Sequence, residues 1–398
     1  MGLSSSIDVD RGKGVRRIQV AQTQHIEIML TVDIIAGARP NFMKIAPIVH
    51  AIDADQSSIE YRLIHTGQHY DAKMSGDFFT QLGIPEPHYN LGAGSGSQAE
   101  QTGAIMRGYE QVLQTKPSDL CLVVGDVTST MACAIVAKKA GIDVAHVEAG
   151  IRSGDRTMPE EINRLVTDAI TDYFFTTSAK ANESLRTAGI DDSAIFFVGN
   201  TMIDTLLKNI DRLRKPDFFD EQSLISGNYI VITLHRPANV DKPENLATML
   251  NAIAESANGL PVIFPVHPRT RKNLEQLPQL PECIHVVDPQ PYLQFIYLVK
   301  NAKAVLTDSG GITEETTVLG VPCMTLRDST ERPETVTMGT NELIGTSVSN
   351  IPPAMQRLLA GQWKSGQVPP KWDGKTGARI VEILKQLQAA SQTRTNAA

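Results

Sequence analysis

Short apolar segments that alternate with helical patterns are the feature that most limits what this chain can fold into. Eleven such segments follow Thr31, most of them rich in Val and Ile. They lie at 32–36, 61–66, 120–124, 143–148, 172–177, 194–198, 229–234, 261–266, 284–287, 303–307 and 321–326. Because most are apolar on both faces, they predict strands buried in parallel sheets beneath helices. This alternation predicts a doubly wound, Rossmann-like α/β protein.

The length of 398 residues predicts two domains rather than one. The strand segments divide near residue 200, which predicts an N-terminal Rossmann-like domain at 29–199 and a C-terminal one at 200–371. Residues 1–28 are polar and Gly/Ser-rich at their start, and we expect them to form a disordered leader. A final helix is expected within 372–390.

Composition and charge exclude several classes of function. The formal net charge of −7 disfavours nucleic-acid binding, which usually needs a basic face. No apolar stretch has the length of a membrane span, and the start of the chain carries no apolar signal segment. The four cysteines show no C-x-x-C spacing, so we expect no zinc or redox motif and a cytoplasmic location.

Polar clusters follow six of the predicted strands directly. They lie at 37–40, 125–126, 148–150, 235–237, 267–268 and 308–311. In open α/β sheets, ligands bind beyond the carboxyl ends of the strands. Because the clusters occur in both halves of the chain, we expect one cleft that both domains line.

Two of these clusters have the chemistry of an anion site. Ser309, Gly310 and Gly311 precede a helical pattern, with Ser309 as the expected N-cap and the glycines allowing backbone N–H groups to approach an anion. An ordinary capped turn is the alternative. Arg39 and Lys44 belong to a helix without an acidic first turn, where a guanidinium can clamp a phosphate.

An acidic set and one histidine are the candidates for proton transfer. Asp126 and Glu148 follow apolar strands, where a carboxylate is costly to bury without a function. Glu160 follows Pro159 at a helix start, so helix capping explains part of its presence. His235 ends a strand of the second half, and a buried, hydrogen-bonded histidine is the alternative there.

Together these segments resemble a known family. GARPNFMKIAP, GDVTST, HVEAGIRSGD, MPEEINR, LHRPANVD, DPQPYLQF, TDSGGITEE and DSTERPE occur in the order found in bacterial UDP-N-acetylglucosamine 2-epimerases of the non-hydrolysing type. The resemblance covers residues 30 to about 350. It implies the GT-B type of architecture, in which two domains face a cleft and the last helix crosses back to the first domain.

The resemblance also implies roles for individual residues. Inversion at carbon 2 would proceed by loss of UDP to a 2-acetamidoglucal and its re-addition, and the enzyme would supply precursors of surface polysaccharides. The expected partners are a UDP-sugar and a second copy in a homodimer, without metal or nicotinamide. The implied acid/base set is Asp126, Glu148, Glu160 and His235, and the implied substrate-binding set is Arg39, Lys44, Gln290, Phe295, Ser309, Gly310, Gly311, Glu315 and Arg332.

The chain departs from the family pattern at Asn41, where Glu is common, and at Asp71 in the segment that often forms an activator site. These departures indicate a side branch, for which a modified UDP-sugar such as a diacetamido-uronic acid is a second candidate substrate. The pattern is also compatible with a hydrolysing epimerase, a GT-B glycosyltransferase and an inactive UDP-sugar-binding regulator. Arg39-Pro40 favours the non-hydrolysing type, and the retained carboxylates and His235 disfavour the regulator.

Overall fold

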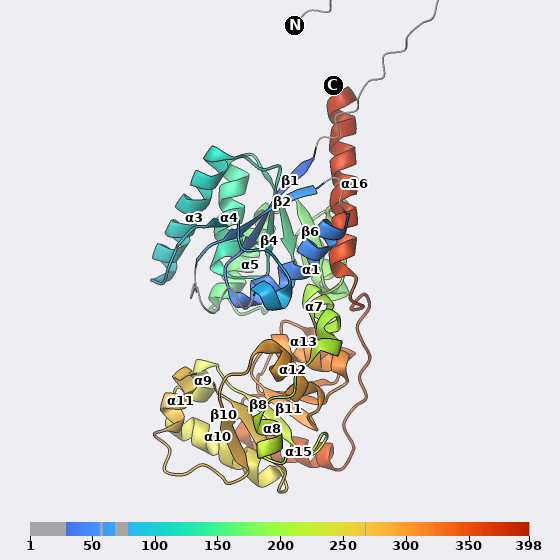
Figure 1. Ribbon diagram of the computed structural model, residues 1–398. Coiled ribbons are helices and arrows are strands. Elements are labelled where there is room, and N and C mark those ends of the chain that lie inside the picture. Colours follow the sequence, from blue (N-terminus) through green and yellow to red (C-terminus); the bar gives the residue numbers. More distant parts are fainter. Residues whose placement is uncertain (1–28, 56–58, 68–78, 267, 398) are drawn as a thin grey trace, which may run out of the picture.

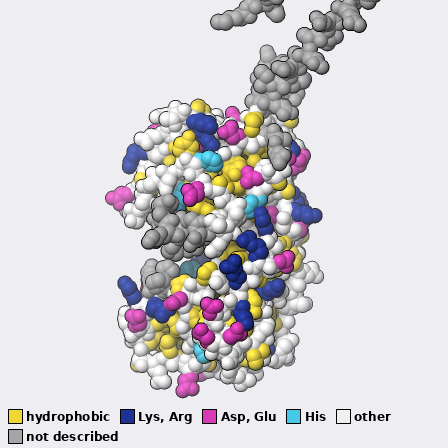
Figure 2. Space-filling view, in the orientation of Figure 1, with side chains coloured by type: hydrophobic (Ala, Val, Ile, Leu, Met, Phe, Trp, Pro, Cys, Tyr) yellow, Lys and Arg dark blue, Asp and Glu magenta, His cyan; other side chains and the backbone are white. Residues whose placement is uncertain are grey.

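The computed structural model describes residues 29–55, 59–67, 79–266 and 268–397, and the expected leader at 1–28 lies outside this range. Two lobes, each built around a parallel sheet, lie one above the other in Figure 1, and a hollow separates them in Figure 2. The α/β architecture and the two Rossmann-like units predicted from the sequence are confirmed. Among the described residues, no helix is long and apolar enough to cross a membrane.

The first sheet has seven strands in the order β3-β2-β1-β4-β5-β6-β7, all parallel. Its strands are β1 (Leu30–Ala36), β2 (Ile59–His65), β3 (Tyr89–Asn90), β4 (Leu120–Val124), β5 (Asp143–Val147), β6 (Tyr173–Thr176) and β7 (Ile195–Phe197). The associated helices are α1 (Arg39–Asp55), α3 (Gln98–Thr115), α4 (Thr128–Lys139), α5 (Pro159–Ile170), α6 (Ala179–Thr187) and α7 (Thr201–Asn209). Separate apolar clusters on the two faces of the sheet form the core, one with α1 and one with α3 and α4.

The second sheet has six parallel strands in the order β10-β9-β8-β11-β12-β13. Its strands are β8 (Ile230–Thr233), β9 (Val262–Pro265), β10 (Ile284–Val287), β11 (Ala304–Thr307), β12 (Cys323–Thr325) and β13 (Asn341–Leu343). Its helices are α8 (Phe218–Glu221), α9 (Pro237–Val240), α10 (Pro243–Ser256), α11 (Pro268–Leu274), α12 (Tyr292–Lys300), α13 (Gly311–Leu319), α14 (Pro333–Thr337) and α15 (Ile351–Leu359).

The last helix, α16 (Thr376–Ala397), returns to the first lobe, as the resemblance implied. Figure 1 shows it beside α1, and its residues Ile380, Val381 and Leu384 are part of the same apolar cluster as α1. Lys385 pairs with Asp55 at the end of α1, with 2.9 Å between Nζ and Oδ1. The expected domain bounds of 29–199 and 200–371 are compatible with the two sheets but stay a prediction.

Candidate functional site

The candidate site lies where the strand order of each sheet reverses. In the first sheet this point falls between β1 and β4, and in the second between β8 and β11. Ligands of doubly wound sheets bind in the crevice at such a reversal. Lys44 lies on the helix that follows β1, Asp126 follows β4, His235 follows β8 and Ser309 follows β11. The topology therefore brings the separate polar clusters together.

A cavity of about 860 Å³ occupies this position between the lobes. Both lobes contribute to its wall. The lining residues predicted from the sequence are Lys44, Asp126, Glu160, His235, Ser309, Gly310, Gly311 and Arg332. The volume falls in the range of small-molecule and cofactor sites. The expected shared cleft is thus present in the structure.

Asp126 is held by a helix of its own lobe. Its carboxylate pairs with Arg164 on α5, and Asn163 Nδ2 donates to its backbone oxygen at 2.8 Å. Burial opposes ionisation of Asp126, but the charges of Arg164, Lys44 and Arg332 hold its pKa below the usual value. Asp126 is therefore an ionised carboxylate that lines the cavity, and Glu160 lies at the start of the same α5 helix.

Glu148 has an unusual backbone and a buried side chain. Its φ of 70° lies in the left-handed region, which costs a non-glycine residue about 1–3 kcal/mol and often marks functional sites. Hydrogen bonds from the N–H groups of Glu148 and Ala149 to the Phe175 oxygen, at 3.0 and 3.2 Å, hold this turn against β6. The side chain does not line the cavity, whereas Lys44 and Arg332, which both contact it, do.

The Glu148 carboxylate joins the two lobes. Its Oε2 atom lies 2.7 Å from Lys44 Nζ and 3.0 Å from Arg332 Nη2, while Oε1 is buried without a hydrogen-bond partner among the described residues. Burial opposes ionisation, but Lys44 and Arg332 lower the pKa of Glu148. Arg332 also pairs with Glu314 on α13, whose pKa is raised by burial and by repulsion from Glu148. One guanidinium therefore bridges a carboxylate of each lobe.

His235 is backed by a buried aspartate. Its Nδ1 lies 2.7 Å from Asp308 Oδ1, and its side chain is 58% exposed, whereas Asp308 is fully buried. Asp308 also accepts hydrogen bonds from the backbone N–H groups of His235 and Arg236 and from Asn239. This contact fixes the orientation of the ring. The alternative of a buried histidine is wrong, and His235 presents its ring to the cavity.

The start of α13 differs from the prediction in one detail. Gly310, not Ser309, is the N-cap residue, and no side chain caps the first turn. Ser309 instead donates its backbone N–H to Thr307 Oγ1 at 2.9 Å. A Cβ atom built at Gly311 meets nothing within 4 Å. The uncapped N–H groups at this helix start can therefore bind an anion in the cavity.

Two more arginines, Arg236 and Arg327, line the cavity. Arg327 forms a bidentate pair with Glu331, at 2.8 and 2.7 Å. Arg236 donates from Nε to the Asp308 backbone oxygen but forms no ion pair with a described residue. Burial and repulsion from Arg327 lower its pKa. Arg236 is thus a cation in the cavity wall with which no carboxylate of the described residues forms an ion pair.

Three predicted substrate contacts lie outside this cavity. Gln290 donates to the Asp288 backbone oxygen at 2.7 Å, and Phe295 packs on α12 against the core. Glu315 is buried and accepts a hydrogen bond from Tyr292 at 3.0 Å. Burial raises the pKa of Glu315 to about 8, so it is mostly protonated at neutral pH. The resemblance implies that Gln290 and Phe295 contact the uracil and that Glu315 binds the ribose, and these roles stay predictions.

The first βα turn is organised by Asn41, the residue at which the chain departs from the family pattern. Its Oδ1 accepts hydrogen bonds from the N–H groups of Gly37 and Ala38, and its Nδ2 donates to the Val124 oxygen at 3.2 Å. A neutral amide can bridge the ends of β1 and β4 in this way, because it both donates and accepts. The side chain of Arg39, together with Asp71 and His267, lies outside the described part of the structure.

The sequence placed Asp308 and Arg236 in polar clusters after strands without assigning them a role, and it offered Glu314 either as a partner of the helix dipole or as a ribose ligand. Arg164 was missed. It lies four residues after Glu160 on α5, a spacing that places both on one helix face. The contacts of Asp308, Arg236 and Glu314 depend on how the chain packs, so no sequence signal indicated them.

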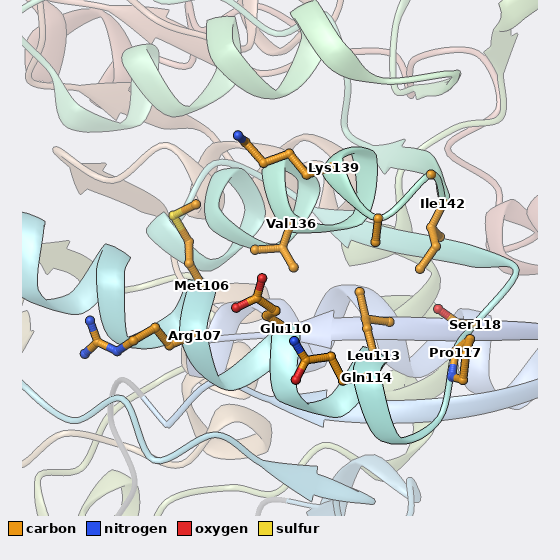
Figure 3. A pocket seen from close by; sticks show the side chains of 12 residues that line it. Met106, Arg107, Glu110, Leu113, Gln114, Pro117, Ser118, Val136, Lys139 and Ile142 are labelled. Atoms are coloured by element: carbon orange, nitrogen blue, oxygen red, sulfur yellow. The ribbon is translucent and has the colours of Figure 1, made fainter.

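A second cavity, of about 730 Å³, lies between α3 and α4 (Figure 3). Its wall includes Ser118, two residues before β4, and Ile142, directly before β5. It therefore opens at the opposite edge of the sheet from the candidate site. None of the predicted site residues lines it.

The fold and the cavity define a GT-B type protein with a shared cavity between two Rossmann-like lobes. The family described as UDP-N-acetylglucosamine 2-epimerase matches residues 50–385, and the chain belongs to this family.

Individual relatives agree with this assignment. A UDP-N-acetylglucosamine 2-epimerase of Methanocaldococcus jannaschii is 42% identical, over 89% of this chain and 99% of its own. A UDP-2,3-diacetamido-2,3-dideoxy-D-glucuronate 2-epimerase of Pseudomonas aeruginosa is 38% identical over the same shares. The crystal structure of the Methanocaldococcus jannaschii enzyme with UDP-GlcNAc and UDP has a TM-score of 0.79 and covers 90% of this chain and 100% of its own.

Proposed function

We propose that this chain interconverts UDP-GlcNAc and UDP-ManNAc at carbon 2 without net hydrolysis. The observation that carries the proposal is that the two lobes bring different groups to one cavity. In the first lobe the ionised Asp126 lines the cavity and the ionised Glu148 contacts two cations that line it, while the second lobe contributes the uncapped start of α13 together with Arg332. This is the pairing that proton transfer at a sugar and departure of a diphosphate require.

The proposed reaction consumes no water, because the UDP and the proton that leave the sugar are both replaced. A carboxylate removes the proton from carbon 2, the released electron pair forms a double bond between carbons 1 and 2, and the bond from carbon 1 to the UDP oxygen breaks. The UDP oxygen then adds back to carbon 1, while a second acid delivers a proton to the opposite face of carbon 2. Departure of UDP builds negative charge on its phosphates, which the α13 start, Lys44 and Arg332 would stabilise.

The shared cations link substrate binding to the chemistry. Lys44 and Arg332 lower the pKa of Glu148, which makes it a weak base while no anion competes for them. A diphosphate beside these cations would offset part of their charge, so the pKa of Glu148 would rise toward neutrality. Proton transfer is most efficient when the pKa lies near the working pH. We therefore propose Glu148, Asp126 and Glu160 as the acid/base set, with His235 beside them.

Separating the products formed from UDP-GlcNAc tests the proposal. We expect a mixture of UDP-GlcNAc and UDP-ManNAc whose total amount stays constant, because UDP is re-added to the same intermediate. Anion-exchange chromatography resolves the nucleotides from free sugar. Stoichiometric release of ManNAc and UDP would establish a hydrolysing epimerase instead.

A modified sugar is the second candidate substrate, favoured by the cation Arg236, which pairs with no described carboxylate. The Pseudomonas aeruginosa relative is named for a diacetamido-glucuronate, whose carboxylate is the kind of group that an arginine binds bidentately. The same assay with both nucleotide sugars distinguishes the candidates by kcat/KM. The proposal also retains a homodimer and a role in supplying surface-polysaccharide precursors.

A further inference from the structure

A buried ion pair lies beneath the candidate site in the first lobe. His146 on β5 is fully buried, and its Nδ1 lies 2.7 Å from Asp168 Oδ1 on α5. Its other ring nitrogen, Nε2, lies 2.8 Å from the backbone oxygen of Gly125. His146 therefore links the Asp168 carboxylate to the Gly125 backbone oxygen through its two ring nitrogens.

Cations and hydrogen bonds hold the Asp168 carboxylate in its ionised form. The Asp168 carboxylate also lies 2.6 Å from Arg152 Nη1, and its pKa is lowered by His146 and Arg152 although burial opposes this. Asp168 is therefore ionised. A buried carboxylate is costly unless cations and hydrogen bonds satisfy it. The oxygen that pairs with Arg152, Oδ2, also accepts the N–H of Gly150 at 3.0 Å.

The hydrogen bonds of this pair end on the two turns that carry the candidate carboxylates. Gly125 directly precedes Asp126 and has a φ of 69°. Its N–H donates to the Val147 oxygen, and its own backbone oxygen contacts His146 Nε2. Gly150 follows Glu148 by two residues and is bound by Asp168 itself. One ion pair therefore fixes the turn after β4 and the turn after β5 relative to each other.

We propose that His146 and Asp168 are positioning residues that set the separation of Asp126 and Glu148. Neither side chain lines the cavity, so neither would touch the substrate. The inference rests on the proposed function, because it assigns the two carboxylates to one reaction. Proton transfer on opposite faces of a sugar tolerates little displacement of the acid and the base.

Two substitutions of one residue test the inference. His146→Leu keeps a similar volume but removes both donors, and we expect kcat to fall by roughly 10- to 100-fold, as for displaced catalytic groups. KM and the affinity for UDP should change less than about threefold, because most of the proposed anion site, the α13 start and Arg332, lies in the other lobe. His146→Gln places an amide donor near the Gly125 oxygen, and we expect it to restore a large part of kcat.

The design separates failure of this inference from failure of the proposed function. If the unaltered chain does not turn over UDP-GlcNAc, the proposed function is wrong. If it does, near-normal kcat in His146→Leu, equal losses in kcat and UDP affinity, or no recovery in His146→Gln would overturn the positioning role. His285→Gln, on β10 of the second sheet, is the matched control and should behave as the unaltered chain. If His146→Leu does not fold, Arg152→Gln is the second variant. It removes the ion pair between the partly exposed Arg152 and Asp168, and we expect a smaller loss that is confined to kcat.

Discussion

Glu148→Gln is expected to lower kcat about a hundredfold or more, the size typical for loss of a general acid or base. Glutamine keeps the size of the side chain and can accept a hydrogen bond from Lys44, but it cannot titrate. The affinity for UDP should stay the same or rise slightly, because the substitution frees Lys44 and Arg332 from a carboxylate that competes with the diphosphate.

Steady-state turnover and calorimetry with UDP measure these two effects. Glu60→Gln is the matched control, because this carboxylate belongs to the same sheet but its side chain is 49% exposed. Turnover close to that of the unaltered chain would show that Glu148 serves only to hold the lobes together. A loss of UDP affinity as large as the loss of kcat would place Glu148 in binding rather than chemistry.

Gly311→Val should have the opposite pattern, with UDP binding weakened about a hundredfold, or roughly 2.7 kcal/mol. A Cβ atom at this position contacts nothing in the described protein, so the fold should tolerate it. Its methyl groups would occupy the space through which an anion reaches the uncapped start of α13. Gly311→Ala should give a smaller effect in the same direction.

Calorimetry with UDP and thermal unfolding separate binding from stability for both variants. We expect the melting temperature to change little, since a β-branched residue at a helix start costs only a fraction of a kcal/mol. Unchanged UDP affinity in Gly311→Val would exclude the α13 start as the diphosphate site. A loss of affinity accompanied by a large loss of stability would show that the loop itself had been disrupted.

The sequence was sufficient to predict the sheets. All eleven predicted strands are present, because buried parallel strands have a strong signature of continuous Val and Ile. The two strands that were missed, β3 and β13, have only two and three residues and pair on one side only, at sheet edges. Such short edge segments leave too little periodicity to recognise.

The sequence predicted where the candidate site residues lie in the fold but not which side chains contact one another. Strand ends identify where Asp126, His235 and Ser309 lie, because the carboxyl ends of parallel strands meet at one edge. No local pattern reveals that Arg332 bridges Glu148 and Glu314, or that Asp168 organises two turns through His146. These contacts join residues between 18 and 184 positions apart, and their geometry depends on how the whole chain packs.

The label at carbon 2 after turnover in deuterated water tests the central claim most directly. If a carboxylate removes this proton and another acid returns one, the recovered UDP-GlcNAc and UDP-ManNAc should both carry deuterium at carbon 2, seen as loss of the corresponding proton signal by NMR. Epimerised product that retains its original hydrogen at carbon 2 would contradict the account, because a carboxylate that removes this proton and a second acid that returns one from solvent would have replaced it with deuterium.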